Sequence, residues 1–336
     1  MNFGKIDKFV LIGGGTLINY FASQLKIQGL NCITIVSTRH ANEKIENDKT
    51  LETLLKKNSN FNKLDDLNSK TILKIIDSTE NNLFISFDSP WIFSNDLIKN
   101  IFKNKLINSH STRLPFDKGG GGFSWRILNY DKFGICLLHM INNNKIDQGE
   151  ILMYEEFLFP HHLKKPIDFQ KFQIEKEKIF LNKFLNEIIK NKNFNLINQP
   201  SYLSTYMPRL SSVDNGWIDW NIDIIELFAF ICAFDDPYVG SSTLLNGKLV
   251  RIKSVNFTKA EKEFHPYEYG LVFRKTDKWI VVACKSGCLI IEEVIDTRGN
   301  NIINKIKTGD RFITPYKKLD AAKKRYFYTP KGKKKS

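Results

Sequence analysis

The chain has 336 residues, of which 42% are hydrophobic, and its 50 Lys and Arg against 36 Asp and Glu give a formal net charge of +14. This composition excludes an intrinsically disordered chain, and the length suits one large and one smaller folded domain. Five scattered cysteines exclude a disulfide-stapled secreted scaffold and predict a reducing, cytoplasmic location.

The excess of positive charge favours anionic partners such as nucleic acid, sugar nucleotides or folates. No apolar window approaches the length of a membrane span, and the N-terminus lacks a basic segment followed by a long apolar one. We therefore expect a soluble protein with no membrane partner.

Short apolar runs alternate with amphipathic segments through the first part of the chain. Strands are predicted over residues 8–12, 32–36, 83–87, 106–108 and 134–141, and helices over residues 17–27, 51–57, 96–102, 123–128 and 168–190. This alternation predicts a mostly parallel sheet with helices on both faces. The last helix is expected to pack on the core through Ile174, Ile179, Phe180, Phe184, Ile188 and Ile189.

The composition changes after Asn198, where turn-forming residues become frequent. One more helix, residues 222–234, precedes short apolar runs at residues 243–245, 249–255, 270–273, 279–283 and 289–295. Strands at this spacing, with a hairpin signal at Asn246-Gly247, predict a small barrel or sandwich. We divide the chain into residues 1–204, residues 205–316 and a basic tail, residues 317–336.

Three polar side chains suited to acyl transfer stand at predicted strand ends. Asn108 and His110 are two residues apart and so share one side of a strand, and Asp147 lies in the turn after the next strand. Histidine exchanges a proton near neutral pH, asparagine can donate to a developing oxyanion, and a carboxylate can orient the imidazole. Spacing alone leaves open that the three residues only cap turns and satisfy the backbone.

Other motifs are better explained by structure than by chemistry. The glycines Gly13 to Gly15 do not complete a dinucleotide-binding pattern, because its third glycine would fall at Ile18. Cys284 and Cys288 have no second ligand pair nearby, so a hairpin is favoured over zinc. His139 lies inside an apolar strand and is interpreted as a satisfied core residue.

The motifs of residues 106–151, taken together, resemble those of folate-dependent formyltransferases. They are Asn108-Ser109-His110, Leu114-Pro115, Gly119 to Gly122, Trp125-Arg126-Ile127-Leu128 and Asp147-Gln148-Gly149-Glu150-Ile151. Similarity to the methionyl-tRNA branch continues at Pro208-Arg209-Leu210, Ile218-Asp219-Trp220, Ala233 to Tyr238 and Leu245 to Lys248. The resemblance covers nearly the whole chain and implies a Rossmann-like α/β domain followed by a small C-terminal OB-like β-barrel.

This resemblance implies that Asn108, His110 and Asp147 are the catalytic residues and that N10-formyltetrahydrofolate is the cosubstrate. Asn108, with His110, would stabilise negative charge on the formyl oxygen. Asp147 would hold and polarise His110, and one of this pair would help to remove the proton of the attacking amine. The resemblance implies that no metal is required.

The family holds its pterin largely through backbone groups of two loops. By this resemblance the cofactor-binding residues are Phe87, Asp88, Ser89, Trp91, Ile92, Phe93, Asn144 and Ile146. The residues expected on the acceptor side are Gly14, Gly15, Ser111, Gly120, Gly121, Gly122 and Trp125.

The acceptor side departs from the tRNA branch at Ser111-Thr112-Arg113-Leu114-Pro115 and at residues 117–123, and no obvious basic insertion follows the second strand. These departures favour a nucleotide-linked amino sugar as acceptor. The OB-like domain and the basic tail favour tRNA as the alternative, and a homodimer stays open. A non-catalytic folate or nucleic-acid binding module is a third hypothesis, against which the retention of all three polar residues argues.

Overall fold

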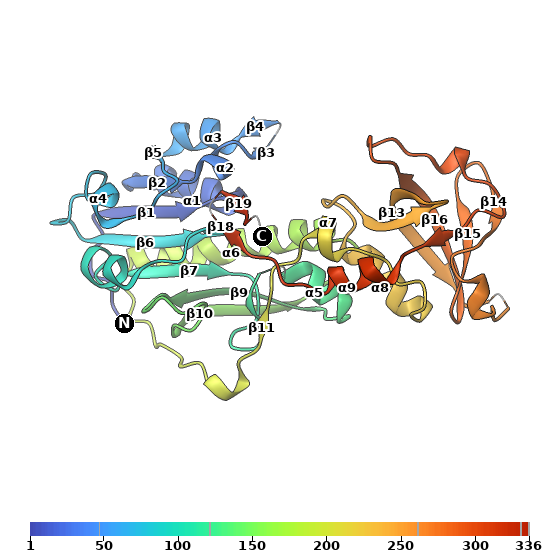
Figure 1. Ribbon diagram of the computed structural model, residues 1–336. Coiled ribbons are helices and arrows are strands. Elements are labelled where there is room, and N and C mark those ends of the chain that lie inside the picture. The colour runs from blue at the N-terminus through green and yellow to red at the C-terminus, as the bar shows by residue number, and fades with distance from the viewer. Residues whose placement is uncertain (47, 121, 261, 330, 335–336) are drawn as a thin grey trace.

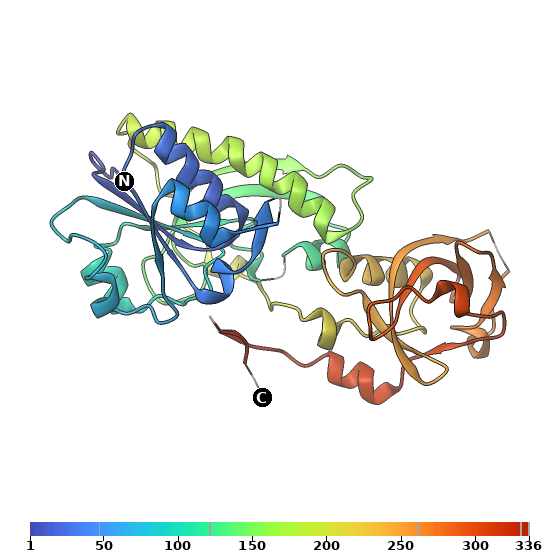
Figure 2. The same cartoon turned by 90° about the horizontal axis from the view of Figure 1, so that it is seen from above.

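The structure is a computed structural model that describes residues 1–46, 48–120, 122–260, 262–329 and 331–334. A part with a seven-stranded sheet is followed by a part with a six-stranded antiparallel sheet (Figure 1). After the second sheet, the chain runs back towards the first part, as Figure 2 shows from above. The two parts therefore contact each other at more than one place along the sequence.

The first sheet has the strand order β10-β9-β7-β6-β1-β2-β5. Its strands are β1 (Lys8–Gly13), β2 (Cys32–Val36), β5 (Asn60–Lys63), β6 (Asn82–Phe87), β7 (Leu106–His110), β9 (Phe133–Met140) and β10 (Ile151–Leu158). Strands β7, β6, β1, β2 and β5 are parallel, and β9 and β10 are antiparallel additions. The prediction of a mostly parallel sheet is confirmed, but β5 and β10 were not predicted because both are edge strands with many exposed side chains.

Helices cover both faces of this sheet. Helices α1 (Gly15–Ile27), α3 (Leu51–Asn58) and α6 (Pro166–Ile189) pack on one apolar face. On the other face lie α4 (Ser69–Ile72) and η1 (Leu97–Ile101). The predicted helix at residues 96–102 is thus a single π-helical turn.

The apolar stripe predicted for α6 is partly wrong. Ile179 and Ile189 are 56% and 47% exposed. The buried face of α6 is formed by Pro166, Phe169, Gln173, Glu177, Phe180, Leu181, Phe184, Leu185 and Ile188. These positions recur every three or four residues, and Ile179 and Ile189 fall beside that stripe and face solvent.

One apolar cluster extends from the first part into the second. Helices α5 (Gly122–Leu128) and α8 (Ile224–Ala233) pack together between the sheets. Their cluster joins Ile127 and Phe169 of the first part to Leu227 and to Ile252 of the second. Within the described ranges, none of the helices combines the length and the apolar character needed to cross a lipid bilayer.

The second sheet has the strand order β14-β15-β16-β13-β12-β17. Its strands are β12 (Ser241–Leu245), β13 (Lys248–Thr258), β14 (Val272–Lys275), β15 (Ile280–Cys284), β16 (Gly287–Ile295) and β17 (Phe312–Ile313). The predicted hairpin at Asn246-Gly247 is confirmed, and both of these residues have positive φ. The outer edges of the sheet are joined, because Val272 N–H donates to Asp310 O and Phe312 N–H donates to Gly270 O, each at 2.9 Å. The sheet is therefore curled.

The remaining elements are short. They are α2 (Thr38–Ala41), β3 (Lys44–Glu46), β4 (Lys49–Thr50), β8 (Lys118–Gly119), η2 (Ser201–Leu203), β11 (Tyr206–Met207), α7 (Ser212–Asn215), η3 (Pro266–Glu268), η4 (Ile303–Lys305), α9 (Tyr316–Ala322), β18 (Tyr328–Thr329) and β19 (Gly332–Lys333). The pair β8 and β11 matters for the site, because β8 leads into the glycine run and β11 belongs to the segment that leads to the second sheet.

Candidate active site

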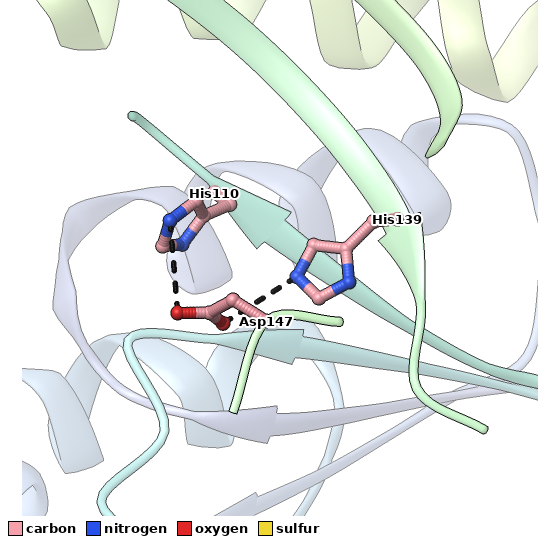
Figure 3. A group of neighbouring side chains, drawn as sticks. All are labelled: His110, His139 and Asp147. Carbon is pink, nitrogen blue, oxygen red and sulfur yellow. Dashed lines mark ion pairs between the residues drawn. The ribbon is translucent and has the colours of Figure 1, made fainter. Parts of the chain in front are cut away.

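The structure brings Asn108, His110 and Asp147 to one place at the carboxyl edge of the parallel strands. His110 is the last residue of β7, and Asn108 lies two residues before it. Asn108 pairs with Ser86 of the neighbouring strand β6. Asp147 arrives on the loop between β9 and β10. Figure 3 shows its carboxylate between the imidazole rings of His110 and His139.

The carboxylate of Asp147 is held by contacts on both oxygens. Oδ2 accepts a 2.9 Å hydrogen bond from Gly119 N–H and lies 3.9 Å from His110 Nε2. Oδ1 lies 3.6 Å from His139 Nε2. The side-chain amide of Gln199 donates to the backbone oxygens of Asp147 and Gly149, which fixes the loop itself.

These contacts keep Asp147 ionised. Burial alone would raise the pKa of Asp147, but the imidazoles of His110 and His139 and the Gly119 amide lower it well below its usual range. At any pH near neutrality, the site therefore contains a negative charge directed at two imidazoles.

The proton on the His110 ring can be placed from its partners. The Thr112 hydroxyl lies 2.6 Å from His110 Nε2 and is also hydrogen-bonded to the backbone oxygen of Asp117. Because a carbonyl oxygen only accepts, the single hydroxyl hydrogen goes to Asp117, and the hydroxyl accepts from His110 Nε2–H. In the neutral ring, Nδ1 then carries the lone pair that can take a proton.

Burial lowers the pKa of His110, although the charge of Asp147 raises it in part. We expect the NMR titration of this imidazole, assigned by its absence in His110→Ala, to have a midpoint below the value of about 6.5 of a free histidine. Replacing Asp147 with asparagine removes the charge that favours the imidazolium and should lower the midpoint further. A wild-type midpoint at or above 6.5, or an upward shift in Asp147→Asn, would contradict this electrostatic description.

His139 was interpreted from the sequence as a core residue, and the structure changes that interpretation. It is indeed 1% exposed, and its Nδ1 is hydrogen-bonded to Met140 O. However, its Nε2 faces Asn108 Nδ2 at 3.0 Å as well as Asp147. The missing information was the antiparallel register, which places His139 directly opposite Asn108. Gly119 was missed as a site residue for a similar reason, because its contact with Asp147 joins segments far apart in the sequence; Thr112 was also missed, although it lies only two residues from His110.

The two loops expected to hold the folate lie side by side. The backbone N–H of Asn144 donates to Asn95 Oδ1 at 3.2 Å and so links the loop after β9 to the segment after β6. The backbone at Asp88 has positive φ, and Ser89 Oγ accepts from Trp91 N–H. The hydrogen bond between Asn144 and Asn95 therefore fixes the two loops next to each other.

The side chains predicted to bind the folate differ in their exposure to solvent. Phe87 and Phe93 are buried in the core, so any ligand contact there would use their backbone. The Trp91 indole donates to Asp65 O. Ile92 is 71% exposed, and Ile146 is also exposed.

Among the predicted acceptor residues, Gly14 and Gly15 lie beside the folate segment. Gly14 N–H donates to Phe87 O at 2.9 Å, and Gly15 has φ of 79° beside the carboxyl group of Asp88. A side chain at Gly15 would place Cβ 2.8 Å from Asp88 Oδ2. These two glycines therefore allow β1 and the segment after β6 to approach closely.

The Ser111 side chain was expected on the acceptor side, but it is directed at helix α6. Its hydroxyl donates to Glu177 Oε1 on α6 at 2.5 Å, and Gln173 also donates to that carboxyl group. Burial raises the pKa of Glu177 to about 7, although these two hydrogen bonds lower it in part. The structure thus assigns the Ser111 side chain to a buried polar network.

The glycine run lies against the segment leading to the second part. Gly120 N–H donates to Met207 O, and the Trp125 indole donates to Pro208 O. Gly122 begins α5, and Gly121 lies outside the described residues. A shallow pocket here is lined by Thr112, Asp117, Gly119, Gly120, Gly122, Trp125, Arg126, Asn129, Asp131 and Met207. Gly14 and Gly15 do not line this pocket.

Among the described residues, one cluster has side chains of the kind that can hold a metal ion. One ligand atom from each of His110, His139 and Asp147 lies within 4.8 Å of the others. Both Nε2 atoms are already hydrogen-bonded, to Thr112 and to Asn108, and a metal would displace both bonds. These partners suit proton chemistry and the orientation of an amide.

A histidine with an ionised partner and an adjacent amide, at the carboxyl edge of a parallel sheet, defines a group-transfer site. Comparisons with known proteins identify the kind of group. Residues 211–307 match the family model of the formyl transferase C-terminal domain. A methionyl-tRNA formyltransferase of Mycoplasma genitalium is 24% identical over 309 residues, 88% of this chain and 93% of that protein. Another, of Prochlorococcus marinus, is 30% identical over 156 residues, 43% of this chain and only 45% of that protein.

Solved structures share the fold over most of the chain. The sugar 3N-formyltransferase WlaRD, crystallised with dTDP and 5-N-formyl-THF, has a TM-score of 0.64 at 19% identity, covering 86% of this chain and 98% of its own. The N-formyltransferase of Helicobacter canadensis, in complex with folinic acid and dTDP-3-aminofucose, has a TM-score of 0.63 at 18% identity, covering 86% of this chain and 100% of its own. The chain is therefore similar in sequence to formyltransferases, and it shares the fold of solved folate-dependent formyltransferases over most of its length.

Proposed function

We propose that this protein is an enzyme that transfers a formyl group from N10-formyltetrahydrofolate to a primary amine. The observation that carries the proposal is the convergence of Asn108, His110 and Asp147 at one edge of the sheet. A charged carboxylate beside a neutral imidazole suits general-base catalysis of amine attack. A neighbouring amide suits the charge that develops on the formyl oxygen.

Asn108, His110 and Asp147 each have a separate role in the transfer. The neutral His110 takes the proton of the attacking amine at Nδ1, while its Nε2–H stays directed at Thr112 and Asp147. Asp147 stabilises the imidazolium that forms and keeps the ring orientation. Asn108 donates a side-chain N–H to the formyl oxygen. The folate supplies an activated formyl group, and the leaving nitrogen receives the proton held by His110.

For the folate we propose the stretch of surface formed by Asp88, Ser89 and the loop that includes Asn144. The hydrogen bond between Asn144 and Asn95 supports this placement, because it fixes the two loops next to each other. Backbone groups of these loops would bind the pterin, since Phe87 and Phe93 are turned into the core. Trp91 and Ile92 would border the ligand.

For the acceptor we propose a nucleotide-linked amino sugar, bound beside Gly120, Gly122 and Trp125. Two structural relatives, covered over 98% and 100% of their own chains, are a sugar 3N-formyltransferase and an N-formyltransferase, and their crystals contain dTDP and dTDP-3-aminofucose respectively. The glycine run in place of the usual loop of the tRNA branch points the same way. We further propose that the curled second sheet is OB-like, that residues 205–316 form a separate domain, and that the protein is cytoplasmic.

Methionyl-tRNA is the second candidate acceptor, because the two sequence relatives above are methionyl-tRNA formyltransferases. The basic tail would serve this function by binding phosphates of the RNA. In the structure, Arg325 is in contact with Tyr206, and Lys333 is paired with Asp214.

Turnover with the two acceptor classes separates these candidates. We expect faster formylation of 3-amino or 4-amino sugars linked to a nucleotide than of initiator methionyl-tRNA, measured by release of tetrahydrofolate at equal concentrations. Arg325→Ala and Lys333→Ala provide the internal control, because they should lower only a tRNA reaction and make it less salt-dependent. Faster formylation of tRNA would refute the sugar assignment but leave formyl transfer intact.

A further inference from the structure

His139 is the buried polar group that the sequence did not connect with the site. It stands on β9 directly opposite Asn108 of β7, so the two side chains project from the same face of the sheet. Its ring meets that of His110 edge to face, with centroids 5.8 Å apart (Figure 3). His139 therefore contacts Asn108 and His110 of β7 while its own side chain stays buried.

The hydrogen-bond partners of His139 define its tautomer. Nδ1 lies 2.9 Å from Met140 O, and a carbonyl oxygen only accepts, so Nδ1 carries the hydrogen. In the neutral ring, Nε2 then presents a lone pair. The side-chain nitrogen of Asn108 lies 3.0 Å from it, within hydrogen-bond distance, whereas Asp147 Oδ1 lies farther away at 3.6 Å. The contact is therefore a hydrogen bond from the Asn108 amide to His139 Nε2.

This bond decides which way the Asn108 amide points. An asparagine amide can rotate by half a turn and exchange its oxygen for its nitrogen at little cost, unless neighbours select one orientation. The lone pair of His139 accepts from the nitrogen and repels the oxygen. One hydrogen of the Asn108 NH2 group is used by His139, and the second stays available to a ligand.

We infer that His139 is a positioning residue for formyl transfer, which holds the Asn108 amide with its free N–H directed at the formyl oxygen. This role rests on the proposed function of the site. His139 would not touch the substrates, and its effect would be transmitted through Asn108. It thus differs from His110, which exchanges a proton.

The first test uses the wild-type protein and does not depend on turnover. Imidazole 15N resonances should show His139 protonated at Nδ1 and bare at Nε2 near neutral pH. The side-chain NH2 resonance of Asn108 should shift when His139 is replaced by leucine. The inference would be overturned, even in an active enzyme, by a His139 ring protonated at Nε2. It would also be overturned by an Asn108 NH2 resonance that is unchanged in His139→Leu.

The kinetic test is a double-variant cycle. We expect His139→Leu to lower kcat by about 10-fold to 100-fold, as for a misplaced or missing oxyanion donor, with little change in either KM. His139→Gln, which can present an oxygen acceptor to the amide, should recover most of this loss. In an Asn108→Ala background, His139→Leu should cause no further loss, because residues that act through one another are not additive.

Leu138→Val is the matched control, because Leu138 is buried on the opposite face of the same strand. It should lower the thermal unfolding temperature without the selective loss of kcat. Losses that multiply in the Asn108→Ala, His139→Leu double variant would refute a role through Asn108. Failure of the wild-type protein to formylate any amine would instead count against the proposed function, and the NMR test would still decide the placement of Asn108.

Discussion

Replacing His110 with alanine is expected to lower kcat for formyl transfer by about 10²-fold to 10⁴-fold, the usual contribution of a positioned general base. The variant removes the Nδ1 lone pair that receives the amine proton and the positive charge that Asp147 stabilises. Folding should be retained, because His110 is the last residue of β7, at the end of the strand where the loops begin. Single-turnover formation of the formylated product and the thermal unfolding temperature measure the two effects separately.

His162→Ala is the control for this experiment, since His162 is an exposed histidine on the loop before α6. Its rate should equal that of the wild type. A near wild-type rate for His110→Ala would remove His110 from the mechanism, and a large fall in its unfolding temperature would show a structural role.

Replacing Gly149 with alanine is expected to damage both stability and turnover. A Cβ at this position would lie 1.7 Å from Met140 O, and Met140 is the last residue of β9. This contact is with backbone, so either β9 or the loop carrying Asp147 must move. Overpacking of this kind costs about 1–3 kcal/mol, and displacement of the carboxylate should lower kcat as well.

Gly299→Ala provides the comparison for the second variant. Its φ of 86° also disfavours alanine, but the added methyl group would meet no neighbouring atom within 4 Å. We expect a modest loss of stability and an unchanged kcat, measured by chemical denaturation and by initial rates. Equal effects of the two substitutions on kcat would show that the close approach of Gly149 and Met140 does not position Asp147.

Local patterns in the sequence were sufficient for much of the fold and for the central residues of the site. The apolar run before Asn108 predicted a strand, and its end placed Asn108 and His110 at the edge where Asp147 also lies. The hairpin at Asn246-Gly247 was predictable because two consecutive residues with positive φ favour this pair. The strand and the hairpin each depend on residues that are near neighbours in the sequence, whereas the joint role of Asp147 with Asn108 and His110 was implied by the family resemblance.

Features set by pairing between distant segments could not be predicted in this way. His139 has the sequence context of a core residue, and only the register of β9 against β7 reveals its contact with Asn108. Ser111 belongs to a plausible acceptor motif, but its partner is Glu177 on a helix that covers the sheet. Phe93 has the aromatic character of a ligand wall and instead packs against Phe102.

The contacts of strand β8 limit where the chain can accept insertions or deletions. Its Gly119 donates to the carboxylate of Asp147, and the same two-residue strand pairs with β11 of the segment that enters the second part. Insertions or deletions near residues 200–208 would therefore act on the reacting carboxylate before they disturb either apolar core. The connection between the two parts thus has its length constrained by catalysis, in addition to any constraint from folding.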